Sequence, residues 1–328
     1  MENQINENKY EFSCKKEEVK TSVLELLEDV GLRLSEAVRL LDADKVSLLL
    51  PKRKRNSHKG TYGRAAIVAG SARYTGAAYL ATAACLRAGA GYTALFAPSD
   101  ILPHYMLKMP EALLCPISAG NDLVFCEENF TPLLSYHSIA YGMGMGVSKD
   151  VAKGARYLLE HYAGKLIIDA DGLNSLAEYE KENFDALFLN KKCDVVLTPH
   201  VKEFSRLSGK TTEEIIKDGT FAAMDFSKKY AVNVLLKNAV SIIANGNQVL
   251  LNAAGTSGQA KGGSGDVLSG AIAGLCASGL SAFDGACAAA YIVGKAAELA
   301  CKKTSTYSLL ATDVISYMGA SFLKIIGE

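Results

Sequence analysis

The chain contains the stretch Ala260-Lys261-Gly262-Gly263-Ser264-Gly265-Asp266-Val267-Leu268-Ser269-Gly270, in which a glycine-rich turn runs into a segment that favours a helix. Glycines let the backbone adopt left-handed angles and approach a ligand closely. The following helix would direct free N–H groups and its positive dipole end at this turn, which suits a transferring phosphoryl group. Asp266 could then take a proton from a hydroxyl that attacks phosphorus. The same pattern also fits a plain turn in which Asp266 only caps the helix.

Around this stretch, short apolar strands alternate with helical segments from about residue 65 onward. Strands are expected at 65–69, 92–97, 138–141, 165–168, 194–197 and 232–236. Helices are expected at 76–88, 151–162, 212–230, 266–277, 282–301 and 312–325. Asn245-Gly246-Asn247 indicates a late hairpin. The alternation predicts an α/β fold with a mostly parallel central sheet flanked by helices, in which ligands bind at the carboxyl ends of the strands.

Composition excludes several function classes. Lys+Arg and Asp+Glu number 35 each, so no net charge attracts nucleic acid or a membrane surface. The eight cysteines form no CxxC pair, which favours reduced thiols. With no signal peptide and no long apolar run, a cytoplasmic location and no membrane partner are expected. The basic run Lys52-Arg53-Lys54-Arg55 is interpreted as a solvated loop.

The first 44 residues differ from the rest because they are charge-rich and poor in glycine. Val19, Val23, Leu26 and Leu34 fall at helical spacing, which predicts one or two amphipathic helices. We therefore divide the chain into an N-terminal helical extension (1–44) and one α/β domain (45–328).

Other turns also carry candidate functional residues. Gly142-Met143-Gly144-Met145-Gly146 fails the GxGxxG pattern, which disfavours a Rossmann oxidoreductase. Asp169 and Asp171 could orient Mg²⁺, water or phosphate, or could simply form a turn. His200 and Glu203 lie three residues apart at a predicted helix start, with no third ligand nearby for zinc. Lys237, at a strand end, suits a nucleotide phosphate or an ordinary surface position.

Taken together, the segments resemble the ADP/ATP-dependent NAD(P)H-hydrate dehydratases of the ribokinase-like superfamily, across roughly residues 45–328. The specific feature is the joint occurrence, in the family's order, of His58-Lys59-Gly60-Thr61-Tyr62-Gly63, Thr198-Pro199-His200 with Glu203, and the stretch 262–270. Thr256, Gln259 and Lys261 stand where the family often has Asn, Met and Thr. Asn238 stands where glycine is usual. These departures lie at positions that contact the nucleotide, so they leave open whether ADP or ATP is the phosphoryl donor.

The resemblance implies a reaction and a set of roles. ADP or ATP would phosphorylate the ring hydroxyl of the S-epimer of hydrated NADH or NADPH, and elimination of phosphate would restore NAD(P)H. Asp266 would be the base, with Gly263 and Gly265 stabilising the transferring phosphoryl group. The remaining implied contacts are as follows: adenine nucleotide at Lys237, Asn238, Ala239, Val240, Ser241 and Gly265; hydrated dinucleotide at Ala77, Gly144, His200 and Asp266; Mg²⁺ at Glu203 and Asp169. The resemblance also implies a homotetramer.

Two alternatives stay open. A ribokinase-like kinase of a vitamin precursor or sugar would use the same Asp266 and the same anion site but release a stable phosphoester. A catalytically inactive nucleotide-binding protein would act through partners. Many relatives carry an N-terminal epimerase domain, for which 44 residues are too few, so no epimerase activity is expected.

Overall fold

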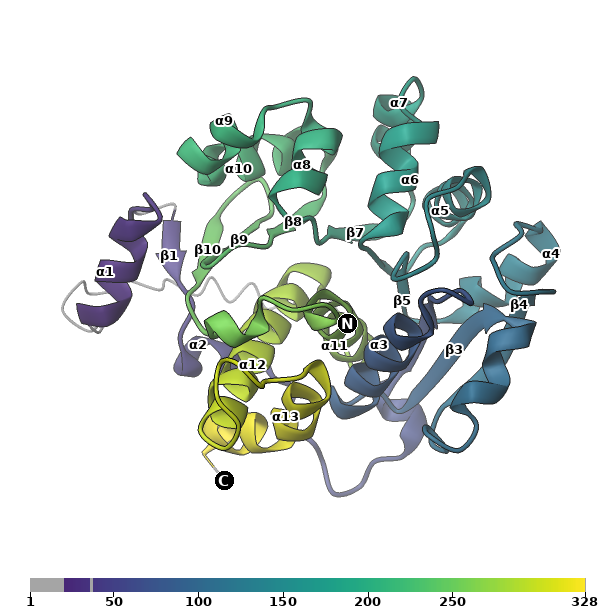
Figure 1. Cartoon of the computed structure of the whole chain (residues 1–328), viewed down its shortest axis with the longest axis horizontal. Helices are drawn as coiled ribbons and strands as arrows, with labels where there is room; N and C mark the ends of the chain where they lie inside the picture. The colour runs from purple at the N-terminus through teal and green to yellow at the C-terminus, as the bar shows by residue number, and fades with distance from the viewer. Residues whose placement is uncertain (1–20, 36–37, 328) are drawn as a thin grey trace, which may run out of the picture.

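A ten-stranded sheet forms the centre of the structure, a computed structural model that describes residues 21–35 and 38–327 (Figure 1). Its strands are Val38–Leu40 (β1), Arg64–Val68 (β2), Tyr92–Pro98 (β3), Leu113–Ser118 (β4), Ser138–Tyr141 (β5), Lys165–Ile168 (β6), Asp194–Leu197 (β7), Asn233–Leu236 (β8), Ser241–Ala244 (β9) and Val249–Asn252 (β10). Their order is β1-β10-β9-β8-β7-β6-β5-β2-β3-β4. The pairs β8–β9 and β9–β10 are antiparallel, and the other pairs are parallel. The predicted α/β fold with a late hairpin is confirmed.

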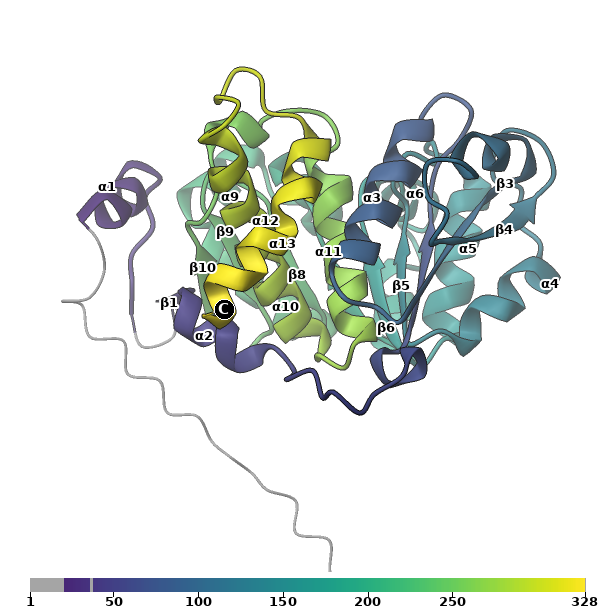
Figure 2. The ribbon, with the colours of Figure 1, turned by 90° about the horizontal axis from the view of Figure 1, so that it is seen from below.

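Helices cover both faces of the sheet, as the two views show (Figures 1 and 2). One layer contains Ala43–Leu49 (α2), Thr75–Arg87 (α3), Ser264–Ala277 (α11), Ala282–Cys301 (α12) and Ala311–Ile326 (α13). The other contains Glu127–Phe130 (α4), Lys149–His161 (α5), Asp171–Tyr179 (α6), Phe184–Leu189 (α7), Val201–Ser208 (α8), Thr212–Lys217 (α9) and Gly219–Tyr230 (α10). Each layer buries its own apolar cluster against one face, because strands alternate their side chains between the two faces.

Small residues bring α11 unusually close to α3. A Cβ on Gly270 would lie 2.0 Å from the carbonyl oxygen of Ala81, and one on Gly274 would lie 2.7 Å from that of Cys85. Both distances are below any normal contact, so only glycine allows this approach. The alanine-rich sequence of α3 and the glycines of α11 thereby fix where the N-terminus of α11 meets the sheet.

The structure corrects three expectations. The single helix predicted over 212–230 is wrong, because the chain breaks at Asp218, whose carboxylate accepts a hydrogen bond from the amide of Phe221 and begins α10. Strand β4 was not predicted, since it contains Pro116, which an edge strand tolerates. Strand β1 lies in the segment predicted as helical and pairs in parallel with β10.

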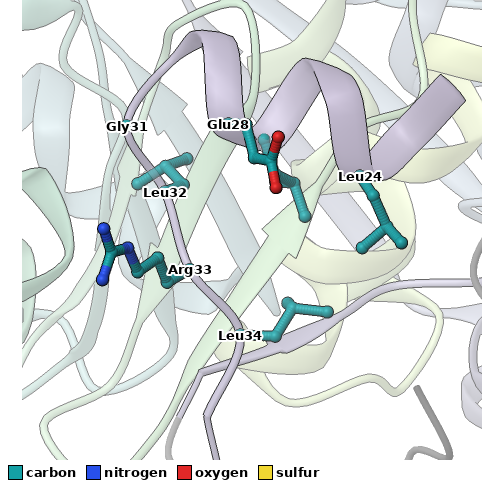
Figure 3. A pocket seen from close by; sticks show the side chains of 7 residues that line it. Leu24, Glu28, Gly31, Leu32, Arg33 and Leu34 are labelled. Carbon is teal, nitrogen blue, oxygen red and sulfur yellow. The ribbon is translucent and has the colours of Figure 1, made fainter. Parts of the chain in front are cut away.

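The predicted amphipathic helix in the N-terminal segment corresponds to Thr21–Asp29 (α1), which lies beyond β1 at the outer edge of the sheet (Figure 1). Leu27 is buried, and an open groove lies between α1 and the residues that follow it (Figure 3). The groove is lined by Leu24, Leu27, Glu28, Gly31, Leu32, Arg33 and Leu34. The part of this expectation that concerns residues 1–20 lies outside the described residues, and the division at residue 44 stays a prediction. Over 21–35 and 38–327, no helix is long and apolar enough to cross a membrane.

Candidate active site

The polar turns identified in the sequence meet at the carboxyl-end rim of the sheet. Strands β5, β6, β7 and β8 are neighbours, and they end directly before Gly142, Asp169, Thr198 and Lys237. The N-terminus of α11 reaches the same rim, because a Cβ on Gly265 would lie 3.3 Å from Lys237 Nζ and 3.5 Å from Asp169 Oδ2. Residues far apart in the chain therefore form one polar site.

A buried ion pair lies at the centre of this site. Lys237 Nζ donates to Asp169 Oδ1 at 2.7 Å, and Ser269 Oγ on α11 donates to Asp169 Oδ2 at 2.7 Å. Burial alone would raise the pKa of Asp169, but the Lys237 charge and these hydrogen bonds outweigh it and lower the pKa. Burial would lower the pKa of Lys237, but the carboxylates of Asp169, Glu203 and Asp266 raise it. Both groups are therefore charged at neutral pH.

His200 and Glu203 form a capping box at the start of α8. The amide of His200 donates to Glu203 Oε2 at 2.8 Å, while His200 Nδ1 accepts from the amides of Lys202 and Glu203. Burial and the Lys237 charge lower the pKa of His200. A neutral imidazole that accepts at Nδ1 carries its proton on Nε2. Because Nε2 lies 3.4 Å from Glu203 Oε1 and the His200 side chain is 49% exposed, this N–H can also donate to a ligand.

The glycine-rich turn forms a helix start whose geometry suits an anion. Gly263 is the N-cap of α11 with a positive φ of 94°, and no side chain caps this end. The amides of Gly265 and Asp266 make no hydrogen bond with any other described residue. Together with the nearby ammonium of Lys237, these N–H groups suit a phosphoryl group.

Asp266 occupies the third position of α11, beside these amides. No hydrogen bond joins its carboxylate to another described residue, and the N-cap Gly263 has no side chain to cap this end. Burial, reinforced by the charges of Asp169 and Asp171 and opposed by Lys237, raises the pKa of Asp266 to about 6. A carboxylate with a pKa near neutrality accepts a proton better than an ordinary aspartate does.

The predicted dinucleotide contacts Ala77 and Gly144 touch each other. A Cβ on Gly144, whose φ is +62°, would lie 2.6 Å from the Cβ of Ala77, and Ser71 Oγ donates to the Gly144 carbonyl at 2.9 Å. Asp171 Oδ2 accepts from the amide of Gly146 at 2.8 Å, which links this loop to the turn after β6. Burial raises the pKa of Asp171.

The predicted nucleotide contacts 237–241 span the β8–β9 turn and the first residue of β9, Ser241. Asn238 and Ala239 are exposed, whereas Val240 is buried. Because only 1% of the whole residue is exposed, Val240 presents little surface to a ligand in this structure.

Sequence reasoning assigned no role to Ser269, although it directly contacts Asp169. The available signal was its spacing, because residue 269 lies one helical turn after Asp266 on the same face of α11.

The motif 58–63, by contrast, lies away from the rim. Its 3₁₀ turn Lys59–Tyr62 precedes the amino end of β2, and a Cβ on Gly63 would lie 2.1 Å from the Ala277 carbonyl oxygen at the other end of α11. This motif packs the opposite end of the fold.

The predicted Mg²⁺ ligands do not form a cation cage. Within the described part of the chain, no three His, Cys, Asp or Glu side chains converge on a metal position. Both oxygens of Asp169 already accept hydrogen bonds, and Glu203 Oε2 accepts from His200. These residues do not fit a metal held by the protein alone, although Mg²⁺ commonly binds through phosphates and water with one or two carboxylates.

Comparisons with known proteins show which family the chain is similar to. The family model described as NAD(P)H-hydrate dehydratase matches residues 65–319. An ADP-dependent (S)-NAD(P)H-hydrate dehydratase of Neisseria meningitidis is 33% identical over 252 residues, which are 75% of this chain and 80% of that protein. A bifunctional NAD(P)H-hydrate repair enzyme Nnr of Coxiella burnetii is 34% identical over 85% of this chain and 54% of its own length. The chain spans about half the length of such bifunctional relatives.

Solved structures show the same fold. The ADP/ATP-dependent NAD(P)H-hydrate dehydratase of Bacillus subtilis, co-crystallised with ATP and Mg²⁺, superposes with a TM-score of 0.75 at 28% identity, covering 89% of this chain and 100% of that one. A ribokinase-like superfamily protein of Enterococcus faecalis, 24% identical, gives a TM-score of 0.78 over 90% of this chain and 99% of that one.

Proposed function

This chain belongs to the NAD(P)H-hydrate dehydratase family, and from that premise we propose that it uses ADP or ATP to dehydrate the S-epimer of hydrated NADH or NADPH. The observation that carries the proposal is the position of Asp266. A carboxylate with a pKa of about 6 stands beside free helix-start amides and the charged Lys237–Asp169 pair. This combination suits base-assisted phosphoryl transfer to a hydroxyl.

In the first step, Asp266 takes the proton of the ring hydroxyl while the hydroxyl oxygen forms a bond to phosphorus. The bond from phosphorus to the departing nucleotide breaks, so ADP leaves as AMP. The amides of Gly265 and Asp266 stabilise charge on the transferring phosphoryl oxygens, because such donors act strongly in a partly desolvated site. Lys237 stays protonated against Asp169 and adds a fixed positive charge.

In the second step, the C–O bond breaks and its electron pair leaves with phosphate. The lone pair of the ring nitrogen assists the departure, and the adjacent ring carbon then loses a proton to the departing phosphate, which restores the double bond. His200 acts as a hydrogen-bond donor in this scheme, since its Nδ1 accepts from backbone amides and its proton is on Nε2. A hydrogen bond from Nε2 would orient the dinucleotide.

We further propose that Glu203 would hold a Mg²⁺ ion bound together with the nucleotide, and that the ion would supply positive charge against the phosphates. Asp169, the second proposed ligand, could bind the ion only after losing its hydrogen bond from Lys237 or from Ser269. A homotetramer and a cytoplasmic location stay predictions.

A coupled assay tests the proposal. The protein is mixed with hydrated NADH, Mg²⁺ and either ADP or ATP, and the return of reduced-nicotinamide absorbance is followed. The wild type should restore the absorbance, whereas Asp266→Asn should bind nucleotide without restoring it. A fully active Asp266→Asn would refute the assignment of the base.

The same assay separates the alternative of a small-molecule kinase. A kinase would consume the donor with a vitamin precursor or sugar and leave a stable phosphoester, with no return of absorbance from hydrated NADH. Donor consumption coupled to dehydration therefore favours the dehydratase.

A further inference from the structure

A lysine next to the glycine-rich turn contacts a separate loop. Lys261 immediately precedes Gly262, and its Nζ donates to the carbonyl oxygen of Tyr307 at 2.6 Å. The segment 302–310 lies beside this turn, because a Cβ on Gly258 would be 3.1 Å from the Thr306 carbonyl oxygen and one on Gly263 would be 3.2 Å from the Cβ of Ala311. Lys261 is exposed, and the Tyr307 side chain is 93% exposed.

The rim of the sheet near Lys261 carries more carboxylates than cations. Asp169, Asp171, Glu203 and Asp266 are four carboxylates that gather at one rim of the sheet. The ammonium of Lys237 is already paired with Asp169 at 2.7 Å. These four carboxylates face three cations, Lys237, Lys202 and Arg206, so a nucleotide diphosphate or triphosphate would still enter a site with more negative than positive groups, which opposes its binding.

Lys261 can supply the missing positive charge. None of the ion pairs in the part of the chain that the structure describes uses Lys261, and its one hydrogen bond to a carbonyl leaves two N–H donors. Its four-carbon stem is flexible, so the ammonium can exchange the Tyr307 carbonyl for another acceptor beside this turn.

We propose that Lys261 binds a phosphate of the adenine nucleotide that is not transferred, exchanging the Tyr307 carbonyl for a phosphate oxygen and setting the affinity for the donor. This inference rests on the proposed function, since it names a contact of the same site. Lys261 is a donor-binding residue, and Asp266 remains the base. The exchange moves no proton and breaks no covalent bond.

Lys261→Met tests the proposal, with Lys261→Arg retaining the charge. Lys303→Met is the matched control, because Lys303 is an exposed lysine on the 302–310 segment. Charge-assisted hydrogen bonds to phosphate are strong, so we expect Lys261→Met to raise the KM for ADP and its Kd by about tenfold or more. The kcat and the KM for hydrated NADH should stay within about twofold, and Lys261→Arg and Lys303→Met should resemble the wild type. The ADP affinity of Lys261→Met should also fall less steeply with salt than that of the wild type.

A purely structural lysine would give a different pattern. If Lys261→Met lost kcat and both KM values equally, or if Lys303→Met had the same effect, the proposal would be overturned. An unchanged Kd for ADP by calorimetry would overturn it as well. Calorimetry needs no turnover, so a wild type that binds ADP but restores no NADH would refute the proposed function and leave the Lys261 comparison intact.

Discussion

Replacing Asp266 by Asn should abolish dehydration and, at the same time, stabilise the fold. In the folded protein the pKa of Asp266 is raised to about 6 from an ordinary value of 3.8. Between these two values the folded state holds more protons than the unfolded state, so stability falls as the pH rises through this window. At about 1.4 kcal/mol per pH unit, ionised Asp266 costs up to about 3 kcal/mol at pH 8.

Asparagine has nearly the same shape and cannot ionise, so Asp266→Asn avoids this cost. Urea unfolding of both proteins should show a gain of about 2 to 3 kcal/mol at pH 8 and little difference near pH 4. Asp284→Asn is the matched control, because Asp284 occupies the same third position of α12 and accepts from Ser281 Oγ, away from the rim. The control should keep its activity and show no gain at pH 8. An Asp266→Asn variant that is active, or that is less stable than the wild type at pH 8, would refute the reasoning.

Three further predictions follow from the same contacts. The kcat/KM for hydrated NADH should rise with pH along an acid limb near pH 6, because Asp266 must be ionised to act as the base; a limb below pH 4.5 would mean that the carboxylate is not perturbed. Lys237→Met should lower the free energy of unfolding in urea by about 3 to 5 kcal/mol, because it leaves the Asp169 carboxylate buried without its partner. Adding Asp169→Asn should recover part of this loss. A loss below about 1 kcal/mol would contradict the role of this ion pair. Gly265→Ala should raise the KM for ADP at least tenfold. It should change the free energy of unfolding by less than about 1 kcal/mol, since the new Cβ would lie 3.3 Å from the movable end of the Lys237 side chain. An unchanged KM for ADP would show that phosphate does not bind at this helix start.

Much of the fold follows from local patterns. The strands 138–141, 165–168 and 194–197 begin and end where the apolar runs predict, because each is a short buried segment bounded by turn residues. Strand β4 could not be found in this way, since as an edge strand it combines exposed Leu113 with Pro116 and lacks a continuous apolar run. The break at Asp218 depends on a single cap bond inside an otherwise helical sequence.

The site was less accessible to sequence reasoning, because its contacts join distant parts of the chain. Asp169 and Lys237 are 68 residues apart, and Asp169 and Ser269 are 100 apart, so no spacing rule connects them. The sequence indicated each residue type at a strand end, and the parallel sheet brought them to one rim. It could not show that Asp169 is occupied by Lys237 and Ser269, which weakens its interpretation as a metal ligand, or that the motif 58–63 lies at the other end of the fold.

The most direct test of the central claim is the stoichiometry of one reaction. The protein is incubated with hydrated NADH and ADP in the presence of Mg²⁺, and NADH, AMP and inorganic phosphate are quantified together. The account predicts that the three products form in equal amounts and that none forms with Asp266→Asn. Formation of AMP with a stable phosphorylated dinucleotide, or of NADH without consumption of ADP, would contradict it.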